Sequence, residues 1–290
     1  MICPSLLVAG ICLAQPAAEP VPAEATVARL VAVLPAPVPR RVALSDVVVV
    51  GKVVRIEDKT VAAARAPGDT EKTEHRIAVV QVDEVVGGAR RMKEVRVGFA
   101  PPPPNPRPRP GGFRAVTLEK DQEVCLFLSA RPDADFYYAR EFADVVDRKA
   151  GNFAADLAEA KRCVKLLADP DAGLKSEAAE DRYLTAAMLV TRYRTPRWPT
   201  GLVLKTERVD AARSKAILSA LAEADWAGPN RRLATMTPQA VFQSLGLGER
   251  DGWKQPTDFR QFEAEAKKWI EAHKDSHRIE RFVEDRAEGR

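Results

Sequence analysis

The chain has 290 residues, of which 46% are hydrophobic and 30% are charged. This composition is ordinary for a globular protein with a sizeable core, and the length suggests two domains. The 45 basic and 41 acidic residues are interleaved and leave a net charge of only +4, which argues against a nucleic-acid-binding protein.

The N-terminus contains a short apolar segment, residues 5–14, followed by small residues and proline. Such a segment is too short to span a bilayer and is typical of a secretory signal peptide. No Lys or Arg precedes it, so a buried or disordered N-terminal segment is the alternative. We predict a signal peptide over residues 1–18, an extracytoplasmic protein (periplasmic or secreted) and no membrane span.

Cleavage near residue 18 would leave two cysteines, Cys125 and Cys163. Each lies in an apolar stretch, EVCLFL and KRCVKLL, which favours two unpaired buried thiols. A single disulfide between them would also be compatible with an oxidising compartment.

Residues 19–40 are rich in Ala, Pro and Val and predict an extended linker. From there to residue 147 the pattern is that of β-strands separated by Gly- and Pro-containing turns. Val95, Val97 and Phe99 alternate with other residues, whereas the run VCLFL at 124–128 is continuously apolar, as in a strand that is buried on both faces. The five predicted strands lie in SDVVVVGKVVRIED, HRIAVVQVDEVVGG, VRVGFAPPPP, DQEVCLFLSA and ADFYYAREFADVV.

The order and apolar pattern of these five runs resemble the N-terminal domain of the tissue inhibitors of metalloproteinases and the related netrin-like modules. The resemblance covers residues 41–147 and implies a five-stranded OB-type barrel. Members of that family inhibit through a Cys-x-Cys motif at the start of the mature chain, and no Cys-x-Cys occurs in this sequence. The resemblance therefore implies a scaffold and transfers no functional residue.

Gly51 interrupts the first apolar run and is followed by Lys52. In a closed barrel the first strand must bend, and a residue without a Cβ atom permits a bulge. We predict a bulge at Gly51 that shifts the alternation by one residue, so that Lys52 faces solvent while Val53 and Val54 return to the core and the rim. A plain edge strand with a glycine defect is the alternative.

Beyond residue 150 the apolar residues follow a helical period. The predicted helices cover residues 153–167, 183–193, 209–226, 237–246, 259–270 and 276–287. With no strand between them they predict a separate all-α domain, residues 150–288. Trp269 should be buried, because it shares an apolar stripe with Phe259, Phe262, Ala266 and Ile270.

Motifs that carry chemistry are scarce. His273 and His277 are four residues apart, but Ser276 between them looks like a helix cap, which favours two surface histidines over a metal site. The sequence contains no HExxH, CxxC, GxSxG or GxxxxGK[ST] motif. It therefore predicts no catalytic residue, no cofactor and no metal, although carboxylate pairs among the 41 acidic residues leave an enzyme possible.

Two stretches are candidate binding patches. In PPPPNPRPRPGG, residues 101–112, a stiff polyproline arm presents Asn105, Arg107 and Arg109. In TRYRTPRWPTG, residues 191–201, the candidates are Arg194, Arg197 and Trp198. The alternatives are a rigid surface loop for the first stretch and packing at a helix end for the second.

The sequence thus predicts an α+β protein in which a five-stranded OB-type β-barrel is followed by a separate all-α helical domain. We expect an exported, non-enzymatic binding module whose partner is another protein and not a nucleic acid; the sequence specifies no oligomeric state. The alternatives are a hydrolase-type enzyme with a carboxylate-based site at the interdomain cleft and a divergent protease inhibitor that uses a rim loop.

Overall fold

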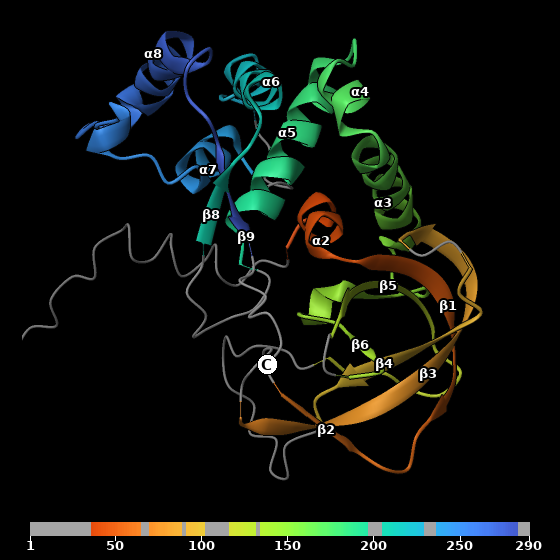
Figure 1. Cartoon of the computed structure of the whole chain (residues 1–290). Helices are drawn as coiled ribbons and strands as arrows, with labels where there is room; N and C mark the ends of the chain where they lie inside the picture. Colours follow the sequence, from red (N-terminus) through yellow and green to blue (C-terminus); the bar gives the residue numbers. More distant parts are fainter. Residues whose placement is uncertain are drawn as a thin grey trace, which may run out of the picture. The chain divides into compact units, whose positions relative to one another are not determined.

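The computed structural model describes residues 36–64, 70–88, 91–101, 116–131, 134–196, 205–228 and 236–283. All of them belong to one compact unit, Pro35–Arg290. The protein is of the α+β class: a strand-rich sheet region is followed by helices and a small second sheet (Figure 1). Each helix in this part of the chain is too short or too polar to span a membrane.

The larger sheet has seven strands, in the order β1-β3-β4-β6-β5-β7, with β2 paired to β3 and with a further pairing between β1 and β5. Neighbouring strands are antiparallel except for β4 and β6, which are parallel. The strands are β1 Val47–Ile56, β2 Val61–Ala64, β3 Lys72–Gly87, β4 Glu94–Phe99, β5 Glu123–Ala130, β6 Tyr137–Tyr138 and β7 Val145–Asp147.

The predicted linker and the predicted last helix differ from the structure. Residues at the end of the linker form a short helix, α2 Val38–Leu44, which precedes β1 and has Pro39 in its first turn. The segment predicted as a helix over 276–287 instead contains a strand, β9, which pairs with β8 to form the second sheet. The expectation of helices alone after residue 150 was therefore wrong. The predicted aromatic strand over 136–142 is also shorter, because only β6 and the turn η1 Phe142–Asp144 lie there.

The other helices lie where the helical spacing of apolar residues predicted them. Thr237 begins α7 as predicted, since its Oγ1 accepts a hydrogen bond from the Ala240 N–H at 3.2 Å, and Gly246 with φ +70° follows the helix. The elements are α3 Phe153–Ala168, α4 Pro170–Leu174, α5 Ala179–Arg194, β8 Lys205–Arg208, α6 Ala211–Ala222, α7 Pro238–Ser244, η3 Glu249–Asp251, η4 Phe259–Gln261, α8 Phe262–His273 and β9 Glu280–Val283.

Two hydrophobic clusters occupy the two faces of the larger sheet. Alternate residues of β5 belong to different clusters: Val124, Leu126 and Leu128 pack in the sheet's own core, whereas Cys125 and Phe127 pack with the helices. The prediction that this strand is buried on both faces is confirmed. Because the helical cluster also contains residues of β1, the sheet and the helices share one core. The division at residues 147–150 into two domains stays a prediction, and this shared cluster runs across it.

Gly51 lies where the pairing of β1 with β3 is irregular, as predicted, but the extra residue belongs to the other strand. Val50 pairs with Glu84 and Gly51 pairs with Val82, so Asp83 is left over on β3. Along β1 the alternation continues through Gly51, since Val49 and Val53 both lie in the sheet core. The predicted shift of alternation at Gly51 was therefore wrong.

The structure gives Gly51 a different physical reason. A Cβ atom there would lie 2.2 Å from the carbonyl oxygen of Gln81, an approach that no side chain tolerates. The glycine is required by the close passage of β3, not by a bulge in β1. The left-over Asp83 reverses the alternation of β3 instead, which turns Val86 toward the helices while Val85 stays with the sheet core.

Candidate functional site

Only one of the six predicted binding residues, Arg194, lies within the described residues; Asn105, Arg107, Arg109, Arg197 and Trp198 lie outside them. The Arg194 side chain donates a hydrogen bond from Nε to the Ser244 carbonyl oxygen at 3.1 Å, and its guanidinium carbon lies 4.7 Å from the centre of the Phe282 ring. It is 13% exposed and joins the end of α5 to α7 and β9. Its membership of a binding patch stays a prediction.

The two C-terminal histidines pack against an aromatic residue. The His273 ring stacks on Trp269 with 4.7 Å between ring centres, and the His277 ring meets Trp269 edge-on at 5.1 Å. Burial lowers the pKa of His277, so it stays neutral at neutral pH. Within the described ranges, no group of three or more His, Cys, Asp or Glu side chains is placed to hold a metal ion.

The carboxylates between the sheet and the helices surround a buried arginine of α2. Arg41 is 7% exposed and bonds Asp156 of α3 through Nη2 at 2.9 Å. Its Nη1 donates to the carbonyl oxygen of Ala143 at 2.6 Å, and its guanidinium lies 4.6 Å from the centre of the Phe127 ring. One cation thus ties α2, α3 and the sheet together, and this is the place where a carboxylate-based enzyme site was predicted.

Asp144 is the most buried carboxylate of this junction, with 6% of its surface exposed. Its Oδ2 accepts hydrogen bonds from the backbone N–H groups of Arg140 and Glu141, both at 2.9 Å. Burial raises the pKa of Asp144 to about 6. Neither Asp144 nor Asp156 lines any of the three cavities described below. Asp144 is enclosed, Asp156 keeps 19% of its side chain exposed, and the contacts of both are those of structural groups.

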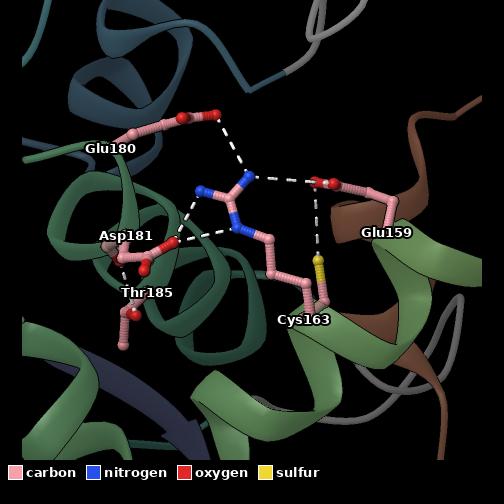
Figure 2. Close-up of polar contacts among 6 residues, drawn as sticks. Glu159, Cys163, Glu180, Asp181 and Thr185 are labelled. Carbon is pink, nitrogen blue, oxygen red and sulfur yellow. Dashed lines mark hydrogen bonds and ion pairs between the residues drawn. The ribbon is translucent and has the colours of Figure 1, made fainter. Parts of the chain in front are cut away.

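Another charged network joins α3 to α5 (Figure 2). The Arg162 guanidinium donates from Nε to Asp181 at 2.9 Å and from Nη1 to Glu180 at 3.1 Å, and it lies 3.8 Å from Glu159. The thiol of Cys163 lies 3.9 Å from the same Glu159 carboxylate. One guanidinium thus holds three carboxylates, two of them on α5, so this network braces the two helices and keeps an excess of negative charge.

Cys125 and Cys163 are both free and buried, as the sequence predicted. Burial raises the pKa of Cys125 to about 12. Burial and the Glu159 carboxylate raise the pKa of Cys163 to about 12 as well. Both thiols are therefore protonated at neutral pH, which excludes them as nucleophiles in the folded protein.

A cavity of about 530 Å³ lies at one end of the sheet, and we call it the charged cavity. Asp121 adopts a left-handed backbone conformation with φ 65°, and its carboxylate pairs with Lys52 of β1 at 2.9 Å. That hydrogen bond lowers the pKa of Asp121. The charged cavity is lined by Thr117, Glu119, Lys120, Asp121, Gln122, Glu123, Asp147, Arg148 and Lys149.

A second cavity of about 550 Å³ lies beside the first half of α3, and we call it the apolar cavity. Its lining residues are Arg148, Ala150, Gly151, Phe153, Ala154, Leu157, Ala158 and Lys161. Lys161 at its edge pairs with Glu84 of β3 at 2.8 Å. Arg148 lines both cavities and pairs with Glu123 at 3.0 Å, so one side chain separates an apolar recess from a charged one.

The two cavities differ in the chemistry that they present. The apolar cavity offers methyl groups and the edge of Phe153, and the charged cavity offers groups of both signs. Sequence reasoning missed both cavities: the charged cavity combines residues 117–123 with 147–149, whereas the apolar cavity lies within the single stretch 148–161. One local signal was available: the small residues Ala154 and Ala158 lie four apart on α3, and Ala150 lies just before the helix, and all three line the apolar cavity.

Compared with protein-family models and with curated proteins, the sequence matches none. The resemblance to metalloproteinase inhibitors and netrin-like modules therefore stays a prediction.

Proposed function

We propose that the chain is an exported, non-enzymatic protein that binds a segment of another protein, and that five of the seven strands of its larger sheet form an OB-type barrel. The pairing pattern supports the barrel: β1, β3, β4, β6 and β5 pair in succession, and β5 pairs again with β1. The parallel pair β4 and β6 departs from an up-and-down order, as expected for a Greek-key barrel of the OB type.

Export rests on the sequence of residues 5–14, which lie outside the described residues. If the signal is cleaved, protein recovered from the native cell should begin after residue 14 or 18. Mass spectrometry of the N-terminal peptide measures this start. A chain that keeps residues 1–18 would contradict the export proposal and leave the binding proposal untouched.

The observation that carries the binding function is the pair of cavities that share Arg148. An apolar side chain of a partner would fill the recess beside α3, and charged or polar groups next to it would meet the charged cavity, whose lining has both signs. The Pro-rich segment 101–112 ends shortly before Thr117, a lining residue, so the predicted arm is joined directly to this site. Loops at the rim are the usual binding region of OB-type barrels.

The binding experiment uses two matched variants of α3. Ala154→Glu places a charge in the apolar cavity, whereas Ala168→Glu places the same charge at the exposed end of the same helix, away from the cavity. The tagged mature protein captures partners from a cell-envelope extract, and the recovered proteins are quantified by mass spectrometry.

The proposal expects a partner whose recovery falls about tenfold with Ala154→Glu and is unchanged with Ala168→Glu. Partners that bind both variants as well as the wild type would overturn the assignment of the groove, by which we mean the charged and apolar cavities together. Circular dichroism confirms that both variants stay folded. We expect Glu to be tolerated at both positions, because Ala154 and Ala168 are exposed.

A further inference from the structure

The third cavity is formed by residues between 208 and 280, later in the chain than the residues that form the groove. No function described so far uses it. It has a volume of about 170 Å³. Segments from the end of β8, the turn after α7, η3 and the turn between α8 and β9 form its walls. The lining residues are Arg208, Leu245, Gly246, Leu247, Arg250, Asp251, Ser276, His277, Arg278 and Glu280.

Three arginines line this small space, together with two acidic residues whose carboxylates already have partners. The Oδ2 of Asp251 accepts the Gly248 N–H at 3.0 Å and lies 3.6 Å from Arg250. The Glu280 carboxylate lies 4.0 Å from Arg194, which is outside the cavity lining. The lining therefore carries three arginines against two acidic residues, an excess of one positive charge, with Glu280 opposite Arg208 in the pairing of β8 and β9.

Neither Arg208 nor Arg278 has a carboxylate oxygen within 4.0 Å among the residues that the structure describes. Arg278 is nevertheless held in place, since its Nε donates a hydrogen bond to the Val209 carbonyl oxygen at 2.6 Å. That bond leaves the two terminal nitrogens of Arg278 as donors. In the apolar cavity, by contrast, both cations are paired, Arg148 with Glu123 and Lys161 with Glu84.

Unpaired arginines that converge on a small recess are the arrangement that binds oxyanions, since each guanidinium offers parallel N–H donors to two oxygen atoms. The Ser276 hydroxyl and the His277 ring add uncharged donors to the same walls. The volume of about 170 Å³ is enough for one tetrahedral oxyanion but not for a nucleotide or a peptide.

We propose that this cavity is a binding site for a phosphate group, with Arg208 and Arg278 as its charged ligands. The phosphate is either free inorganic phosphate or the terminal group of a phosphomonoester whose remainder lies in solvent. The site is independent of the proposed protein-binding groove, and neither depends on the other being correct.

The test measures phosphate binding to the full mature chain by isothermal titration calorimetry. Inorganic phosphate, glycerol 2-phosphate and sodium chloride are titrated at equal ionic strength into the wild type and into Arg278→Gln, Arg208→Gln and Arg91→Gln. Arg91 is exposed and lies on the other part of the chain, before β4, so its variant removes the same charge elsewhere.

We expect saturable binding of at least one phosphate compound by the wild type and by Arg91→Gln, and affinity that is about tenfold weaker in each cavity variant. Preference for inorganic phosphate or for the ester identifies the source of the group. Arg208 is exposed, so Arg208→Gln keeps the test valid if Arg278→Gln fails to fold. Absence of saturable binding, equal affinity in Arg208→Gln and the wild type, or equal binding of chloride would each overturn the proposal.

Discussion

Asp144 should make the protein less stable as the pH rises through the weakly acidic range. Its pKa is about 6 in the folded protein, against a usual value of 3.8, because burial disfavours the ionised form. The folded state therefore holds a proton that the unfolded state releases. A carboxyl group with a raised pKa contributes stability that is complete below the unfolded value and is lost as the pH rises through the folded value. The affected window lies between about pH 4 and pH 6.

Asp144→Asn removes this ionisation and keeps an oxygen for the N–H groups of Arg140 and Glu141. The interval from 3.8 to about 6 is close to two pH units. At about 1.36 kcal/mol per unit, the variant should gain up to about 3 kcal/mol over the wild type between pH 4 and pH 7. Asp144 is 6% exposed, so solvent screening reduces this figure little.

Urea unfolding followed by tryptophan fluorescence measures the free energy of unfolding of both proteins at half-unit steps from pH 4 to pH 7.5. The difference between the two curves isolates Asp144, because all other groups titrate in both. Asp171→Asn is the control: Arg213 lowers the pKa of the exposed Asp171 below 3.8, so the stability of that variant relative to the wild type should stay nearly constant from pH 4 to pH 7.5. A difference between Asp144→Asn and the wild type that stays constant over the range would refute the reasoning.

Four further outcomes are expected. Gly51→Ala should cost about 3 kcal/mol in urea unfolding, since its Cβ would meet the Gln81 carbonyl oxygen, whereas Gly151→Ala, with nothing within 4 Å, should be close to neutral. Trp269→Ala should cost about 3–5 kcal/mol, because Trp269 is 5% exposed, while Phe259→Ala at a 68% exposed site should change stability by less than about 0.5 kcal/mol. Fluorescence and circular dichroism should report one common unfolding transition, as the shared core requires; separate midpoints would support two domains. The mature protein should not inhibit metalloproteinases tightly, and nanomolar inhibition in an enzyme assay would contradict this.

The sequence predicted best where the pattern is local. The run at 124–128 and the cap at Thr237 each contain their own signal, and both are found as expected. The segment around Ile279, Phe282 and Val283 also had a helical spacing, yet it forms a strand. Its backbone is captured by a distant partner, since the Ile279 carbonyl oxygen accepts the Val209 N–H at 2.8 Å and β8 pairs with β9. Strand pairing with a segment so far away in the chain does not change the local spacing of apolar residues, so the sequence pattern alone did not reveal it.

The candidate sites were harder to predict for the same reason. Nothing around Arg41 distinguishes it from the neighbouring Arg40, but the structure buries Arg41 against Asp156, which is 115 residues away. The groove combines residues 117–123 with 147–161, and the phosphate cavity combines residues 208, 245–251 and 276–280. Trp269 was placed correctly, whereas Phe259 on the same predicted stripe is exposed, because η4 turns before α8 begins.

The order in which the chain is synthesised gives helix α2 an unusual position. It emerges before the sheet, but the groups that cover it come much later: Asp156 bonds Arg41, and Arg192 donates to the Ala43 carbonyl oxygen across 149 residues. Until α5 is available, the outer face of β1 and β5 presents Val48, Val50 and Phe127 to water. A nascent chain that stops near residue 148 therefore has a nearly complete sheet with an exposed hydrophobic outer face. Premature termination or slow synthesis at this point should lead to aggregation and not to a stable fragment.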